Sequence, residues 1–230
     1  MKLIKKLIRF VIILLIIFIA AVVVMGKIKY ENAIEEKPIE SAVAEIKSKE
    51  HYTKLEDLTK TYKAAVISVE DRRFYMHRGV DPIGILRAIY RNIKIHKLSE
   101  GGSSITQQLA KNMYFITDDT PTRKVAELLV TYDLEKKYSK DEILELYFNT
   151  IYFGSGYYCV YDASIGYFGK QPFELSAYEA TMLAGIPNAP SVYSPHKNPD
   201  LAKKRQEKVL DAMVKNKVIT KEEAKIISEQ

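Results

Sequence analysis

Residues 69–81 read Val-Glu-Asp-Arg-Arg-Phe-Tyr-Met-His-Arg-Gly-Val-Asp, and they bring carboxylates, arginines, a histidine, aromatic rings and a glycine close together. An apolar run at 64–67 leads into this stretch, and a helix start follows it, with Asp81 as the N-cap and Pro82 at the first helical position. Glu70 is therefore expected where a packed element ends and a loop opens, which is a common place for a working residue. The alternative is a solvated, charged turn with no chemical role.

Toward the N-terminus lies an uncharged run, residues 10–26, that is rich in Ile, Leu and Val. With Leu7, Ile8 and a snorkelling Arg9 it approaches the roughly 20 residues that span a bilayer. Basic residues flank the run, so the positive-inside rule predicts a cytoplasmic tail at 1–9, a single transmembrane helix at 10–26, and an extracytoplasmic remainder. A cleaved signal peptide is the alternative, but the run is long for one and no small-x-small cleavage site follows it.

The charge distribution limits the classes of partner. The net charge of +6 comes from basic residues that precede the first acid, Glu31, and the rest of the chain is formally neutral. A nucleic-acid footprint over the whole protein is therefore not expected. The single cysteine, Cys159, excludes an internal disulfide and metal sites built on several thiolates, and among aromatic residues it is expected to be a core hydrophobe. The basic residues concerned are Lys2, Lys5, Lys6, Arg9, Lys27 and Lys29.

Beyond the anchor, residues 27–50 are charged and rich in alanine, and we expect a stalk or loose helix that lifts the following domain off the membrane. Residues 51–230 are dense in helix starts, because capping-box patterns begin at Thr53, Ser139, Ser176 and Thr220. Alternating strand patterns are scarce, so a mainly α globular domain is predicted; residues 151–170, which mix aromatics with glycines, have no clear assignment. The expected helices are 54–69, 82–95, 104–113, 121–138, 140–150, 176–185, 199–215 and 221–228.

Two further stretches carry chemistry. Residues 98–112 begin as a glycine loop and become a helix, which leaves backbone N–H groups and hydroxyls at a helix N-terminus that suits an anion. Gln108 and Lys111 share one face of that helix with Ser104. In the next helix, Arg123 and Lys124 lie on the face of Glu127, where they would hold a second carboxylate among cations. The plain alternatives are a capped surface helix and a surface ion pair.

Together these stretches resemble the peptidoglycan glycosyltransferases, the transglycosylase family found alone or as the N-terminal module of bifunctional penicillin-binding proteins. The first motif is met by Glu70, Asp71, Phe74, His77, Gly79 and Asp81, the second from Gly101 or Gly102 through Asn112, and the third at 123–127. A fourth and a fifth resemblance cover 140–154 and 179–195. Ser104 stands where the family usually has Thr, and Phe148 where it usually has Leu; neither change removes a reactive group.

The resemblance implies a lysozyme-like, mainly α domain behind one transmembrane helix in the bacterial cell membrane. It implies polymerisation of lipid II into β-1,4-linked glycan strands by inverting transfer, with release of undecaprenyl pyrophosphate. Glu70 would be the general base for the acceptor 4-hydroxyl, and Glu127 would organise cations or hold a divalent ion, Mg²⁺ or Mn²⁺, on the pyrophosphate. No organic cofactor is expected. The implied substrate-binding residues are Asp71, Phe74, His77, Arg87, Ser103, Ser104, Gln107, Gln108, Lys111, Asn112, Arg123 and Lys124.

Within that set, we interpret Asp71 and His77 mainly as organisers of their loop. Outside it, we interpret Tyr152, Phe153 and Pro190 as packing residues. The expected partners are lipid II, the growing glycan, the membrane and cell-wall synthesis proteins such as transpeptidases, with no nucleic acid. Two alternatives stay open: a lysozyme-like hydrolase that cuts the same glycan, and an inactive, membrane-anchored glycan-binding scaffold.

Overall fold

The computed structural model describes residues 2–94 and 101–230, and over these residues the chain forms helices and no strand. The mainly α prediction is therefore confirmed. The predicted loop residues 98–100 and the predicted end of a helix at residue 95 lie outside the described residues.

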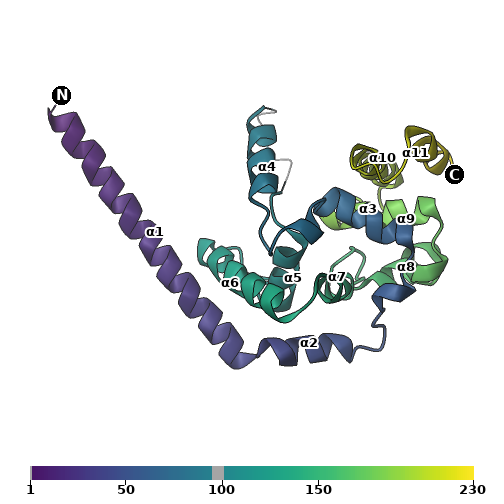
Figure 1. The fold of residues 1–230 in the computed structure, drawn as a ribbon, viewed down its shortest axis with the longest axis horizontal. Coiled ribbons are helices and arrows are strands. Elements are labelled where there is room, and N and C mark those ends of the chain that lie inside the picture. The colour runs from purple at the N-terminus through teal and green to yellow at the C-terminus, as the bar shows by residue number, and fades with distance from the viewer. Residues whose placement is uncertain (1, 95–100) are drawn as a thin grey trace.

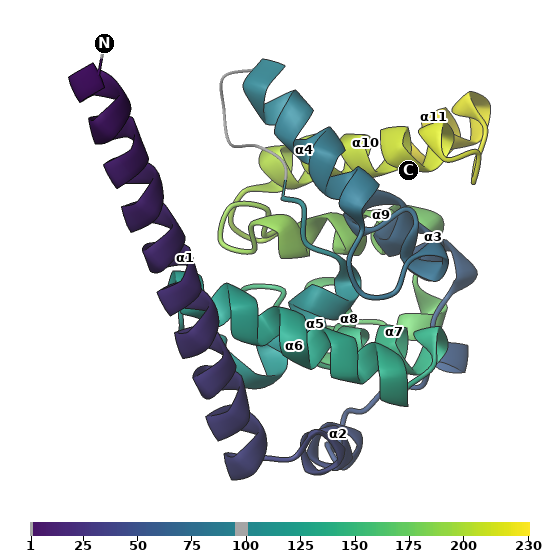
Figure 2. The same ribbon diagram turned by 60° about the vertical axis from the view of Figure 1, so that its left-hand side comes forward.

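A long helix, α1 (Lys2–Glu36), extends from the globule, and its outer part stands clear of every other element in both ribbon views (Figures 1 and 2). The helical segment at residues 4–36 is long enough to cross a membrane and contains an 18-residue window with a mean hydropathy of 3.3; it is the one such segment in the described part of the chain. The apolar side chains of the outer part are about half exposed, with Phe10 at 58% and Phe18 at 59%. These side chains have no protein core around them.

The segment 27–50, predicted to be a stalk or loose helix, is mostly helical. Its first part continues α1 along α6 (Pro121–Lys137), and its second part forms α2 (Ile39–Lys47). Ile39 and Val43 of α2 are buried in the main hydrophobic core. The boundary at residue 50 and the role of a stalk stay predictions; the segment itself packs on the globular part.

The globular part is built from short helices around one apolar core. Helices α3 (Lys60–Glu70), α5 (Ile105–Tyr114), α7 (Lys140–Phe148) and α9 (Ala177–Gly185) contribute buried side chains to the core, as do α2 and α6. In contrast, α4 (Pro82–Lys94) projects from the body of the molecule in both views (Figures 1 and 2). α8 (Val160–Phe168) packs against α9. α10 (Pro199–Lys215) packs on α3 and α9, and α11 (Lys221–Ser228) follows it.

Most predicted helix starts are correct, because local capping decides them. Ser139, Ser176 and Thr220 each form the reciprocal capping box that the sequence predicts. The box predicted at Thr53 is wrong. Thr53 instead donates its backbone N–H to Asn149 Oδ1 at 2.8 Å, and α3 starts only after Thr59, whose side chain caps Tyr62.

Short 3₁₀ turns connect these helices. The turn at Phe74–Met76 lies directly after α3, in the stretch that carries the first motif. Gly79 follows with φ of +83°, and a Cβ there would lie 2.7 Å from Thr131 Cγ2 of α6. This close approach requires glycine, and it fixes the path of the chain from Glu70 to Asp81. The other 3₁₀ turns are Leu55–Asp57, Pro172–Glu174 and Ile186–Asn188.

Candidate active site

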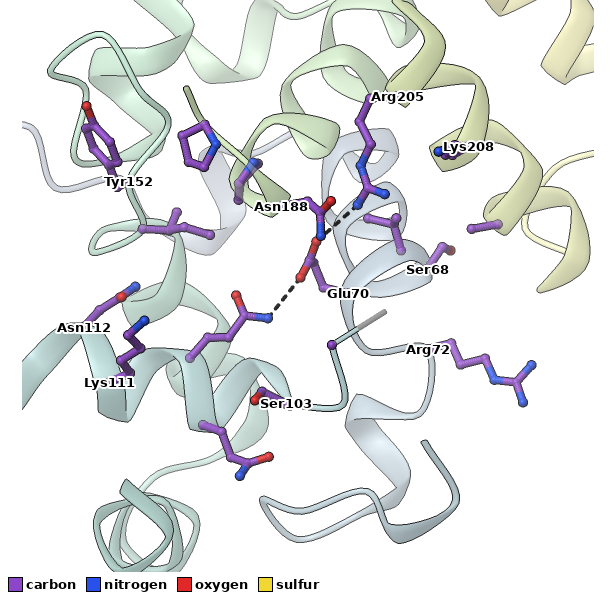
Figure 3. A pocket seen from close by; sticks show the side chains of 18 of the residues that line it. Ser68, Glu70, Arg72, Ser103, Lys111, Asn112, Tyr152, Asn188, Arg205 and Lys208 are labelled. Carbon is purple, nitrogen blue, oxygen red and sulfur yellow. Dashed lines mark hydrogen bonds and ion pairs between the residues drawn. The ribbon is translucent and has the colours of Figure 1, made fainter. Parts of the chain in front are cut away.

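A polar cleft of about 940 Å³ opens between α3, α5, α6 and α10. Basic side chains outnumber acidic ones along its wall, so the cleft favours an anionic ligand. Figure 3 shows Glu70 near its middle, with Lys111 and Tyr152 to one side and Lys208 to the other. The charged side chains of the lining are Glu70, Arg72, Arg87, Lys111, Arg123, Lys124, Glu127, Arg205, Lys208, Asp211 and Lys215.

Glu70 is the last residue of α3, and its side chain is 11% exposed. Gln108 of α5 donates from Nε2 to Glu70 Oε2 at 2.9 Å, and Tyr147 donates in turn to Gln108 Oε1 at 3.2 Å. The Tyr147 hydroxyl therefore fixes which end of the amide faces the carboxylate. On the other side, Arg205 Nη2 lies 3.7 Å from Glu70 Oε1, an ion pair without a direct hydrogen bond (Figure 3).

The environment of Glu70 suits a proton acceptor. Burial raises the pKa of Glu70 above its usual value of 4.5, while the Gln108 hydrogen bond and the Arg205 charge oppose the rise. A carboxylate with a raised pKa is a stronger base than a solvated one. Only one hydrogen bond to the Glu70 carboxylate is found among the described residues, so the group retains the capacity to accept another proton donor.

Glu127 has the opposite surroundings. It is 1% exposed, and both of its carboxylate oxygens accept hydrogen bonds from cations one turn earlier in α6, Arg123 on Oε2 and Lys124 on Oε1. Lys124 also donates to Ser103 Oγ at 3.0 Å. Glu127 therefore holds both cations at the cleft wall, and Lys124 links α6 to the loop that precedes α5.

The structure brings most of the predicted site residues together in this cleft, although their roles stay predictions. Four of them lie behind the wall instead: Asp71, Phe74, His77 and Ser104 are buried and do not line the cleft. The predicted residues that line it are Glu70, Arg87, Ser103, Gln107, Gln108, Lys111, Asn112, Arg123, Lys124 and Glu127.

The N-terminus of α5 is occupied by the protein itself. The Ile105 N–H donates to Asp71 Oδ2 at 3.1 Å, while Ser104 and Gln107 form a capping box. The sequence suggested this helix terminus as a place for a substrate anion, but its anion in the structure is the Asp71 carboxylate. Gln107 accordingly has a structural partner as well as its place in the cleft lining.

Asp71 and His77 form one buried unit. His77 Nε2 lies 2.9 Å from both carboxylate oxygens of Asp71, and the His77 ring meets Phe74 edge-on at 6.4 Å. Ser104 donates from Oγ to the Gly79 carbonyl. These contacts tie the Glu70 loop to the start of α5, so they position Glu70 and Gln108 relative to each other.

The sequence interpretation missed several residues of the cleft. Arg205, Lys208, Asp211 and Lys215 of α10 line it, and their spacing of three or four residues places them on one helical face. That periodicity was visible in the sequence, but nothing in it indicated that this face meets α3. Tyr152 and Pro190, interpreted as packing, also line the cleft.

The arrangement can perform a defined chemistry. A buried carboxylate that can accept a proton faces a space bordered by ammonium and guanidinium groups. Such a space can accept a hydroxyl proton at Glu70 and stabilise a departing anion at the cationic wall. Among the described residues, no group of three or more His, Cys, Asp or Glu side chains is arranged to hold a metal ion.

Comparisons with known proteins agree with this picture. The family model described as Transglycosylase matches residues 36–214. Penicillin-binding protein 1A of Neisseria lactamica is 47% identical over 169 residues, covering 74% of this chain and 21% of that protein. Penicillin-binding protein 1F of Bacillus subtilis is 44% identical over 170 residues, covering 74% of this chain and 24% of that protein.

The chain thus spans between a fifth and a quarter of the length of these curated relatives. Among solved structures, penicillin-binding protein 1A from Haemophilus influenzae has a TM-score of 0.46 and 23% identity, over 78% of this chain and 17% of that one.

Proposed function

The chain belongs to the transglycosylase family, and we propose that it polymerises lipid II into β-1,4-linked peptidoglycan strands. The observation that carries the proposal is the pairing of a buried carboxylate with a raised pKa, Glu70, and a cationic wall within one cleft. A hydrolase would use a carboxylate and water, and it would not need that wall.

In the proposed reaction, Glu70 accepts the proton of the 4-hydroxyl on the lipid II acceptor. The hydroxyl oxygen forms the new bond to the anomeric carbon of the growing strand, and the bond from that carbon to the pyrophosphate breaks. The pyrophosphate departs on the opposite face, so an α-linked donor gives a β-linked product. Negative charge on the departing group is stabilised by Lys111, Arg123 and Lys124, aided by the Ser103 hydroxyl.

The family resemblance also implies a divalent cation on the pyrophosphate, which Glu127 would hold, and this cation is a separate proposal. The residues present do not fit a metal held by the protein, because both carboxylate oxygens of Glu127 accept from cations. We therefore assign no step to it. Polymerisation that continues after exhaustive chelation would exclude a requirement for a divalent cation.

We further propose that α1 anchors the protein in the bacterial cell membrane with the N-terminus in the cytoplasm, and that the cleft acts on lipid-linked substrate outside. The apolar 18-residue window within residues 4–36 supports the anchor, and the basic residues at 2–9 support the orientation. Cell-wall transpeptidases are the proposed partners, because the curated relatives are penicillin-binding proteins.

One experiment separates the candidate functions. The purified chain is incubated in detergent with lipid II, and in parallel with finished glycan strands, and the products are resolved by size. Growth of strands from lipid II supports the transferase. Fragments from finished glycan would support the hydrolase, and an unchanged mixture in both tubes would support the glycan-binding scaffold.

A further inference from the structure

Two exposed tyrosines lie side by side at one end of the cleft. Tyr152 lines the cleft and is 36% exposed, and Tyr158 is 54% exposed. Their ring centroids are 4.6 Å apart with an interplanar angle of 33°. The backbone between them forms a tight turn, closed by hydrogen bonds from Phe153 N–H to Tyr157 O and from Tyr157 N–H to Gly154 O, which brings the two residues next to each other.

Tyr158 also borders a second hollow, of about 170 Å³, outside the cleft. Across it, His51 Nδ1 lies 2.5 Å from Asp162 Oδ1, and the His51 ring stacks on Tyr161 with centroids 4.5 Å apart. The tyrosine pair therefore forms a bridge between the cleft and this hollow. The lining is Lys49, Glu50, His51, Asn149, Tyr158, Cys159 and Asp162.

The hollow and the cleft differ in charge. The cleft wall is strongly basic, whereas the hollow combines Lys49 with Glu50 and Asp162. A pyrophosphate would gain little there. Donors and acceptors beside exposed aromatic faces suit an uncharged ring that carries hydroxyl groups and an apolar C–H face, which is the chemistry of a sugar.

We propose that Tyr152, Tyr158 and this hollow form a glycan-binding subsite for sugars of the growing strand beyond the reacting end. The proposal rests on the proposed polymerase function. In Figure 3, Tyr152 lies on the same side of Glu70 as Lys111 and Asn112, which is the side proposed for the donor strand and its pyrophosphate. Each transfer lengthens that strand, so its earlier sugars pass over the surface next to the donor side.

Binding of soluble glycans tests the subsite directly. The probes are peptide-free GlcNAc–MurNAc disaccharide and octasaccharide, titrated into the full chain in detergent micelles and followed by calorimetry. The octasaccharide binds Tyr158→Ala about fivefold more weakly than the wild type, equal to about 1 kcal/mol, while disaccharide binding is unchanged. Tyr158→Phe keeps the ring and retains the affinity. Tyr132→Ala, at a tyrosine that is 66% exposed on α6, is the matched control and binds like wild type.

Polymerisation supplies the second measurement. Tyr158→Ala and His51→Ala consume lipid II at the wild-type initial rate but release shorter strands, and thermal unfolding verifies that both variants are folded. Normal octasaccharide affinity together with normal strand length in both variants would overturn the subsite. If the wild type does not polymerise lipid II, the proposed function fails on its own, and the octasaccharide titration still decides whether the tyrosine bridge binds glycan.

Discussion

Glu70 and Glu127 face the same cleft, yet the protein surrounds them in opposite ways. Glu70 has one amide donor, Gln108, and an arginine, Arg205, at 3.7 Å, whereas Glu127 is held by two cations in direct contact. The pKa of Glu70 is raised by burial. Glu70 is thus available to accept a proton, whereas Glu127, the same type of residue, is fully engaged as a counter-ion.

The role of each carboxylate therefore follows from the side chains around it and not from its residue type. The partners of Glu127 come from its own helix, at three and four residues' spacing, so its role is written into a local pattern. The partners of Glu70 come from α5 and α10, far away in sequence. The predictions below separate the two carboxylates by activity, stability and pH dependence.

The largest effect is expected from Glu70→Gln, which removes the proposed base and nearly preserves the shape. The rate of lipid II polymerisation falls about 10²–10⁴-fold. Since the folded pKa of Glu70 is raised, its ionisation opposes folding, and stability falls as pH rises from 4.5 through that pKa. The variant is therefore at least as thermostable as wild type at neutral pH. Activity within a few-fold of wild type would remove Glu70 as the base.

The next largest effect is expected from Glu127→Gln, which tests the counter-ion role of Glu127. It leaves Arg123 and Lys124 without their counter-charge, and we expect the free energy of unfolding to fall by about 2 kcal/mol. The estimate is below that for a fully buried pair because the Lys124 side chain is 41% exposed. Denaturant unfolding measures it at neutral pH, with Glu70→Gln as the matched variant. Equal stability of the two variants would show that the counter-ion role is misassigned.

Lys111→Ala tests the cationic wall without touching either carboxylate. A charge-assisted contact to the substrate pyrophosphate contributes about 1.5–3 kcal/mol, so KM for lipid II rises about tenfold or more. Steady-state kinetics with purified lipid II measure the change. Lys136→Ala, at an exposed lysine in the last turn of α6, is the control and leaves KM unchanged. An unaltered KM in Lys111→Ala would exclude this lysine from the wall's function.

The smallest effect is expected from Arg205→Ala, which tests the influence of the Arg205 charge on the pKa of Glu70. Glu70 acts as a base only when ionised, so activity is lost as pH falls through its folded pKa, which lies above 4.5. The Arg205 charge lowers that pKa, and its removal moves the acid limb of the kcat/KM profile to higher pH. Lys204→Ala, next to it on α10 but exposed, leaves the limb in place. A limb that moves to lower pH contradicts the assignment.

Locally encoded features were predictable from the sequence. Ser139, Ser176 and Thr220 carry their capping partner three residues later, so the helix starts need no tertiary information. α8 was not predicted, because its N-cap is Cys159, whose sulfur accepts from the Asp162 N–H at 3.5 Å, and cysteine is not a usual capping signal. The sequence at 151–170 carried glycines and aromatics that fit several structures.

The site was predictable to the extent that its contacts are local. The cations of Glu127 follow from spacing alone, and the clustering of the Glu70 loop with α5 follows from the family resemblance. The approach of Arg205 to Glu70 was not predictable, because it depends on how α10 packs across α3 and α9. Gly185 has a part in this, since a Cβ there would lie 2.9 Å from Arg205 Cγ.

The packing of α1 on α6 has a mechanical consequence. A Cβ at Gly26 would lie 2.5 Å from Val125 Cβ, and further along α1 Lys29 and Tyr30 bind Asp118 and Asp133. α6 carries the cations that Glu127 holds, so the helix proposed to cross the membrane packs directly on the helix that supplies part of the cationic wall. If α1 crosses a bilayer as proposed, a bilayer thickness that changes the tilt of α1 would also change the height and orientation of the cleft relative to the lipid headgroups.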